Sequence, residues 1–214
     1  MQQNIDALLL ISSHCTHCPA MVEGLSQLVK EGRLGRLEIV NIESHPEIAT
    51  ELGVRSVPWY RMGDYLFDGV MGSSELAEWA QRISDNSGQS DYLIYQLEHH
   101  QLDQVVAHLR EHPFRLVELI PLLGDLDTPM AVRIGIGAVI EELEQDPALE
   151  HATPALEHLT LSQEPQVRAD ACHYLGICGN PTAIPAVKNL LDDDSPEVGE
   201  IAAETLAMLH EVQE

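Results

Sequence analysis

The sequence predicts an α/β domain with a mixed sheet and flanking helices, followed by an all-α solenoid of stacked helix pairs. Three observations lead to this class. Strand and helix patterns alternate through the first 88 residues. The remainder has no strand pattern and repeats a pair of helices at intervals of 31 to 35 residues. A polar run, SDNSGQS at 84–90, separates the two kinds of pattern.

The charge of the chain changes at the same place. Residues 1–88 carry 12 acidic and 6 basic side chains, whereas residues 89–214 carry 23 and 5. We therefore predict a first domain over 1–84, a linker over 85–90 and a repeat domain over 91–214.

The first domain is predicted to hold a strand, a helix, a strand, a short helix, a hairpin and a closing helix. Pro19 marks a helix start, Gly53 a helix end, and Ser73 or Ser74 is placed to cap the last helix. The segments are ALLLI (7–11), PAMVEGLSQLVKEG (19–32), LEIVNI (37–42), HPEIATELG (45–53), VRSVPWYRM (54–62), DYLFDGVM (64–71) and SSELAEWAQRI (73–83). The strand-helix-strand unit implies parallel pairing, and the hairpin adds an antiparallel edge, so the sheet is mixed.

Two cysteines, Cys15 and Cys18, lie between the first strand and the helix that follows it. A cysteine at a helix start meets unsatisfied backbone N–H groups and the positive end of the helix dipole, which favour the thiolate. We predict that Cys15 attacks a disulfide and that Cys18 resolves the mixed disulfide. His17, with His14 as a second candidate, would place a cation or donor beside the thiolate and lower the pKa of Cys15.

Two other interpretations of this segment stay open. His14, Cys15, His17 and Cys18 could bind a metal, but four ligands from five consecutive residues do not easily form a tetrahedron, so no metal site is predicted. Alternatively, the pair is inert and the domain serves only for binding.

Residues 5–83 resemble the thioredoxin family. The resemblance rests on Cys15-Thr16-His17-Cys18 and on NIESHPEIATELGVRSVPWY (41–60), which is similar to the segment that leads to the family's cis-proline. It implies a cis Val57–Pro58 bond facing the cysteine pair and no cofactor beyond the redox-active Cys15–Cys18 disulfide. Backbone groups beside the proline could hold a substrate strand. The predicted substrate contacts are Val57, Pro58, Trp59, Thr16 and His14, although Trp59 is by default a packing residue.

The sequence departs from the thioredoxin pattern at three places. His14 replaces a tryptophan, and Thr16-His17 replaces Gly-Pro; a histidine before the second cysteine is similar to a bacterial family of disulfide oxidants. Leu9 stands where thioredoxins carry a buried aspartate that helps to deprotonate the resolving cysteine. The direction of electron transfer is therefore open, and resolution is either slow or uses another base.

The second domain resembles the HEAT family over residues 91–211, in its shorter HEAT-like form. A Pro-x-Val-Arg pattern, as in EPQVRADACHYLGICG (164–179), opens one helix of a pair, and a proline lies in the first turn of the other. The repeated positions are Val132, Val167 and Val198, and Pro121, Pro154 and Pro185. The resemblance implies protein binding along the array.

Other polar features of the second domain are predicted to be structural. Cys172 and Cys178 read as buried, inert thiols. His108 and His112 have a spacing that can bind metal but no further ligand in a recognisable motif. LDDDSPE (191–197) reads as a solvated turn and helix cap.

The function predicted from these observations is a thiol-disulfide oxidoreductase, a reductase or isomerase of protein disulfides, with a repeat domain that binds clients. A thioredoxin-reductase or glutathione system would supply electrons. The alternative is a redox-sensitive chaperone or scaffold in which the first domain mainly binds protein. The net charge of −24 argues against nucleic acid and anionic membranes as partners. The first residues show no basic segment or long apolar core, so we expect a cytoplasmic protein.

Overall fold

The computed structural model describes residues 5–211. The chain divides into two compact units, Met1–Tyr92 and Leu93–Glu214. The predicted linker comprises a turn at 85–88 and the first two residues of helix α4 (Gln89–Glu98), and the two units divide within that helix. Each unit is described by itself below.

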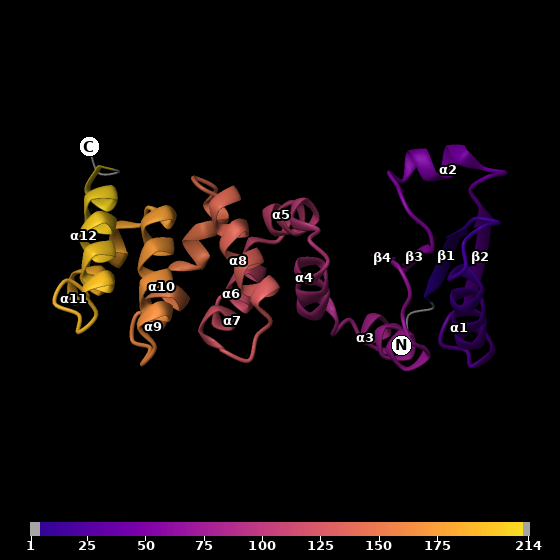
Figure 1. The fold of residues 1–214 in the computed structure, drawn as a ribbon, viewed down its shortest axis with the longest axis horizontal. Helices are drawn as coiled ribbons and strands as arrows, with labels where there is room; N and C mark the ends of the chain where they lie inside the picture. Colours follow the sequence, from indigo (N-terminus) through magenta and orange to yellow (C-terminus); the bar gives the residue numbers. More distant parts are fainter. Residues whose placement is uncertain (1–4, 212–214) are drawn as a thin grey trace. The chain divides into compact units, whose positions relative to one another are not determined.

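The first unit contains a four-stranded mixed sheet in the order β2-β1-β3-β4. β1 pairs with β2 in parallel and with β3 antiparallel, and β3 and β4 form the predicted antiparallel hairpin. The strands are β1 (Asp6–Ile11), β2 (Arg36–Asn41), β3 (Trp59–Met62) and β4 (Tyr65–Asp68), and the helices are α1 (Cys18–Lys30), α2 (Pro46–Glu51) and α3 (Ser73–Ser84) (Figure 1). The strand predicted over 54–62 is shorter than expected: it begins at Trp59, and residues 54–58 lie outside it. Pro58 itself has no N–H to donate to a ladder.

Helices cover both faces of this sheet. On one face the rings of Tyr60 and Phe67 stack with centroids 5.3 Å apart, and Trp79 of α3 lies 5.2 Å from Phe67. α1 packs beside α3 on this side, and Gly24 leaves the space that Leu76 occupies. On the other face Leu10, Val40 and Trp59 form a cluster, against which Ile48 of α2 packs. The α/β class predicted for this part of the chain is confirmed.

The start of α3 differs from the prediction. The N-cap residue is Gly72, and no side chain caps the helix. The first helical hydrogen bond runs from the Leu76 N–H to the Gly72 carbonyl at 2.9 Å, which places Ser73 inside the helix. The prediction that Ser73 or Ser74 caps α3 was therefore wrong.

A tyrosine from α4 closes the outer edge of the sheet. The Tyr92 hydroxyl donates to the Leu66 carbonyl at 3.0 Å and accepts from the Leu66 N–H at 2.8 Å, so it satisfies both backbone groups of an edge-strand residue. Its ring lies edge-on to those of Tyr65, Phe67 and Trp79. Burial raises the pKa of Tyr92 to about 12.

The second unit is a stack of helix pairs, as predicted. Its helices are α4 and α5 (Leu102–Glu111), then α6 (Leu116–Leu119) and α7 (Pro121–Gly124) with α8 (Met130–Glu142), α9 (Thr153–Leu159) with α10 (Pro165–Cys178), and α11 (Ile184–Asn189) with α12 (Pro196–Glu211); short 3-10 turns (113–115, 147–151 and 181–183) precede α6, α9 and α11. α10 packs against both α8 and α12, and in Figure 1 these three helices follow one another in chain order. One hydrophobic core runs from Leu93 to Leu209. None of the helices in the described part of the chain is long and apolar enough to cross a membrane.

An ion pair joins consecutive repeats. Arg168 of α10 donates to both carboxylate oxygens of Asp193, at 2.7 and 2.8 Å, and Asp193 also accepts from the Ser195 N–H at 2.9 Å. Their side chains are only 14% and 8% exposed. The segment 191–197, predicted to be a solvated turn, therefore contains a buried carboxylate that fixes the turn to the preceding repeat.

Candidate functional site

The cysteine pair lies where β1 ends and α1 begins. Cys15 and Cys18 form a disulfide, with their Cα atoms 5.5 Å apart. Cys18 is 3% exposed, whereas Cys15 is half-buried and its side chain is the accessible one. α1 begins at Cys18, one residue before the predicted start at Pro19, and Cys15 lies three residues before the helix. Residues 12–17 form a turn, and Pro19 occupies the first turn of the helix, where it needs no N–H partner.

Cys15 nevertheless meets the helix N-terminus. The Cys18 N–H donates to the Cys15 sulfur at 3.1 Å. An N–H group aimed at the sulfur from a helix start stabilises a thiolate after reduction. Cys15 is thus the more accessible sulfur of the pair and the one that an N–H of the helix start contacts, whereas Cys18 is buried.

The segment before β3 reaches the same sulfur. The Cys15 sulfur lies 3.6 Å from the Val57 carbonyl oxygen, and the Val57–Pro58 bond is cis, as predicted. Pro58 is buried and Val57 is half-buried. The structure thus brings together four of the predicted residues: both cysteines, Val57 and Pro58.

The remaining predicted site residues, His14, Thr16, His17 and Trp59, are not part of this cluster around the Cys15 sulfur. His14, Thr16 and His17 are exposed, and His17 is the N-cap residue of α1 without a side-chain cap bond. The effect of His17 on the Cys15 thiolate stays a prediction. Trp59 is only 9% exposed and packs with Leu10 and Val40, which agrees with the default expectation of a packing residue; its contact with a substrate stays a prediction.

A polar network that the sequence did not suggest holds the loop before Cys15. The Ser13 N–H donates to Glu43 Oε1 at 3.1 Å, and Asn41 Nδ2 donates to the Ser13 hydroxyl oxygen at 3.0 Å. Asn41 Oδ1 accepts in turn from the Glu43 N–H at 2.9 Å. These bonds tie the loop to the end of β2. In the sequence, the only hint of this network is that polar residues follow the ends of two neighbouring parallel strands, β1 and β2.

A hollow of about 320 Å³ opens beside the disulfide. Its walls come from the end of β1, the loop and the first turns of α1: Ile11, Ser12, Ser13, Cys15, Cys18, Pro19, Val22 and Glu23. Leu9, which replaces the family's aspartate, is fully buried on β1. Sequence reasoning did not single out Glu23, because its position in the helix alone does not place it in the cysteine hollow.

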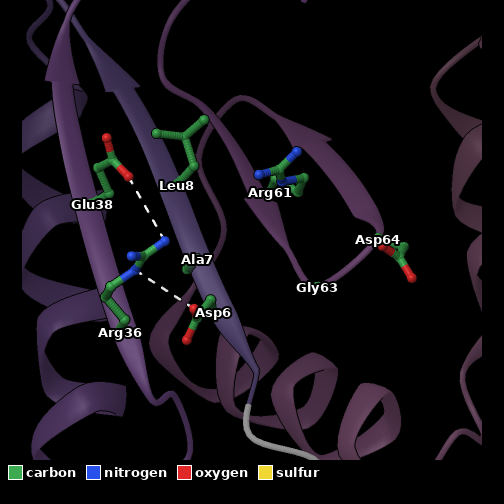
Figure 2. A pocket seen from close by; sticks show the side chains of 8 residues that line it. All are labelled: Asp6, Ala7, Leu8, Arg36, Glu38, Arg61, Gly63 and Asp64. Carbon is green, nitrogen blue, oxygen red and sulfur yellow. Dashed lines mark ion pairs between the residues drawn. The ribbon is translucent and has the colours of Figure 1, made fainter.

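A second hollow, of about 270 Å³, lies toward the start of β1 and is lined by charged side chains (Figure 2). Arg36 pairs there with Asp6 at 3.5 Å and Glu38 at 4.0 Å, and Figure 2 shows Arg61 and Asp64 on the hairpin side. These pairs are well exposed and contribute little to stability. No cysteine or histidine lines this hollow among the described residues, and the cysteine pair lies at the opposite end of β1.

Two known protein families match parts of this chain. A thioredoxin-domain family matches residues 5–81, and a HEAT-repeat family matches residues 152–213. The chain joins a thioredoxin domain to HEAT repeats. No curated protein matches it. We call the two units the thioredoxin unit and the HEAT unit.

The cysteines of the HEAT unit are unlike the pair in the thioredoxin unit. Cys172 and Cys178 are not in a disulfide. Cys172 is fully buried and burial raises its pKa, while Cys178 is half-buried and desolvation raises its pKa to about 12. Burial therefore disfavours the thiolate of both cysteines. Cys172 is buried as expected, whereas Cys178 is only half-buried.

The histidines of the HEAT unit form no metal centre in the described part of the chain. The rings of His108 and His112 lie 4.8 Å apart, and burial, helped by His112 and Arg115, lowers the pKa of His108. No group of three or more His, Cys, Asp or Glu side chains among the described residues is arranged to hold a metal ion. The segment 14–18, whose two cysteines and two histidines were considered as metal ligands, is among the residues searched, and its cysteines form a disulfide.

Proposed function

We propose that the protein is a thiol-disulfide oxidoreductase that reduces or isomerises protein disulfides. The observation that supports this most directly is the Cys15–Cys18 disulfide, whose accessible sulfur accepts from a helix N–H at 3.1 Å and lies 3.6 Å from the Val57 carbonyl. Cys15 attacks a client disulfide, and Cys18 then attacks the mixed disulfide and releases the reduced client. The exchange needs no further cofactor. A thioredoxin-reductase or glutathione system restores the dithiol, and the reaction takes place in the cytoplasm.

The path of the client strand follows from the same geometry. An extended client segment beside Val57 and Pro58 would place its sulfur near Cys15 and exchange backbone hydrogen bonds with that edge. His14 and Thr16, exposed on the loop, contact the client from the other side. His17 supports the thiolate at the start of α1.

The test is disulfide exchange in variants of the full chain. The wild type should reduce a model protein disulfide in the presence of a dithiol, and Cys15→Ser should abolish this activity. Cys178→Ser removes a thiol outside the pair and serves as the matched control, which should retain activity. Equal loss in both variants, or none in Cys15→Ser, would contradict the proposal.

The direction of exchange is measured by equilibrating the pair in glutathione buffers, with alkylation and mass as the readout. A midpoint near about −270 mV indicates a reductant, and one near or above about −180 mV indicates an isomerase or oxidant. Failure to form a disulfide at any ratio would exclude catalysis by this pair.

A second candidate function, a redox-sensitive chaperone or scaffold, is favoured by exposed apolar side chains on the HEAT unit. Met130, Ile134 and Leu161 are 63%, 64% and 75% exposed. Such side chains could hold unfolded clients. A variant with both Cys15 and Cys18 replaced by serine should then still suppress aggregation of a test protein, whereas a pure oxidoreductase would lose its effect.

A further inference from the structure

The resolving step poses a problem of proton transfer. Cys18 is 3% exposed, and a buried thiol must lose its proton before it can attack, although burial disfavours the thiolate. The neighbouring β1 position, Leu9, is fully buried and offers no proton acceptor. An acceptor must reach the Cys18 sulfur from elsewhere.

The hollow beside the disulfide provides such a route. Both Cys15 and Cys18 line it, and so does Glu23, five residues after Cys18 on α1. Glu23 is exposed, so its carboxylate is hydrated. Among the described residues that line this space, Glu23 is the only carboxylic acid.

We propose that Glu23 accepts the proton of the Cys18 thiol through water in this hollow while the mixed disulfide is resolved. In that step the Cys18 sulfur attacks the Cys15 sulfur, the Cys15–client bond breaks and the Cys15–Cys18 bond forms. The client sulfur leaves with the electron pair of the broken bond, and the Cys18 proton passes to the Glu23 carboxylate. The inference rests on the proposed function, because it concerns one step of that reaction.

The other ionisable groups at this end of the sheet are less suited to the task. His14 and His17 are exposed on the loop and do not line the hollow. Glu43 Oε1 already accepts from the Ser13 N–H at 3.1 Å, and Glu43 does not line the hollow. Cys15 is bonded to the client sulfur during this step. Glu23 therefore remains as the acceptor.

The experiment mixes the reduced full-length protein with an excess of a chromogenic aromatic disulfide and follows release of the coloured thiolate by stopped flow. The first equivalent reports attack by Cys15, and the second reports resolution by Cys18. Glu23→Gln should slow the second phase about tenfold or more at neutral pH, leave the first phase unchanged and flatten the pH dependence of the second phase. Glu23→Asp keeps the carboxylate and should retain most of the rate.

Glu38→Gln is the matched control, because it removes the same charge from the opposite end of the sheet. A second readout is the pKa of Cys18 in a Cys15→Ser background, which should fall when Glu23→Gln removes a neighbouring negative charge. Identical second phases in Glu23→Gln and Glu38→Gln would overturn the inference while leaving the proposed function intact. Absence of both phases in the wild type would overturn the proposed function and the inference with it.

Discussion

Two neighbouring aspartates, Asp192 and Asp193, differ in their contacts although their side chains are chemically identical. Asp193 belongs to an acidic run that the sequence gives no reason to distinguish from its neighbours, yet Arg168 holds both of its oxygens. Asp192, next to it, is exposed. The two aspartates therefore have different energetic roles.

Asp193→Asn should lower the free energy of unfolding of the HEAT unit by about 2 kcal/mol, between the values for exposed and buried ion pairs. Urea unfolding followed by far-UV circular dichroism measures the change. Tryptophan fluorescence serves as an internal control, because Trp59 and Trp79 both lie in the thioredoxin unit. Asp192→Asn should leave stability nearly unchanged, and an equal loss in both variants would contradict the assignment.

The same ion pair should give the HEAT unit an acid dependence. The hydrogen bonds from Arg168 lower the pKa of Asp193, so its carboxylate stabilises the fold above the pKa of the unfolded chain, about 3.9. That contribution is lost as the pH falls below about 4, through the lowered pKa. The difference in stability between the wild type and Asp193→Asn should accordingly shrink between pH 5 and pH 2. A constant difference over this range would be inconsistent with the ion pair.

The thiols of the reduced protein should differ sharply in reactivity. Iodoacetamide at pH 7.5 should label Cys15 first, because its sulfur is accessible and faces a helix N–H. Cys172 and Cys178 should react only after urea unfolds the HEAT unit, because burial raises both of their pKa values. Peptide mass mapping identifies the labelled thiol. Labelling of Cys178 as fast as Cys15 would show that the HEAT unit opens in its native state.

At the scale of helices and strands, local patterns predicted most of the fold. The parallel β1–β2 pair, the β3–β4 hairpin and the stacked helix pairs all followed from periodicity, and the cis Val57–Pro58 bond followed from the family resemblance. Contacts between distant residues were not predictable in this way. The Tyr92 bonds to Leu66, the Ser13–Asn41–Glu43 network and the position of Glu23 depend on tertiary packing, which periodicity does not encode. The cap of α3 was also predicted wrongly, at Ser73 or Ser74 instead of Gly72.

The turn between α3 and α4 depends on close packing at Gly88. A Cβ atom at this position would lie 2.9 Å from the Arg82 Cβ, which cannot move independently of its backbone. Gly88→Ala should lower the free energy of unfolding of the thioredoxin unit by about 1–2 kcal/mol, measured by tryptophan fluorescence in urea. Gly72→Ser is the contrasting variant, because the space there is open and serine at the N-cap position of α3 should add about 0.5 kcal/mol. Effects of the same sign in both variants would refute this account of the turn.

At the scale of the whole molecule, the dominant property is a net charge of −24. A field of this sign attracts cationic molecules and repels anionic ones, and salt screens it over about 10 Å at 0.1 M. If the proposed exchange occurs, its rate with a lysine-rich peptide disulfide should fall about tenfold as salt is raised, and the rate with a glutamate-rich peptide should increase. A neutral peptide disulfide of the same length is the control. Equal salt dependence for all three would show that charge plays no part in client selection.

The hydrogen bonds of the Tyr92 hydroxyl also have a consequence for shortened forms of the protein. Without it, Leu66 on the outer edge of β4 would present a bare N–H and carbonyl, and such an edge can pair with the same edge of another molecule. A protein truncated at Gly88 would keep every strand and the cysteine pair but lose this protection. We expect it to self-associate in sedimentation experiments. A protein that ends at Tyr92, before the buried Leu93 and Leu97 of the second core, should remain monodisperse. We therefore expect the smallest stable form of the thioredoxin unit to end beyond residues 5–81, which give it its family match.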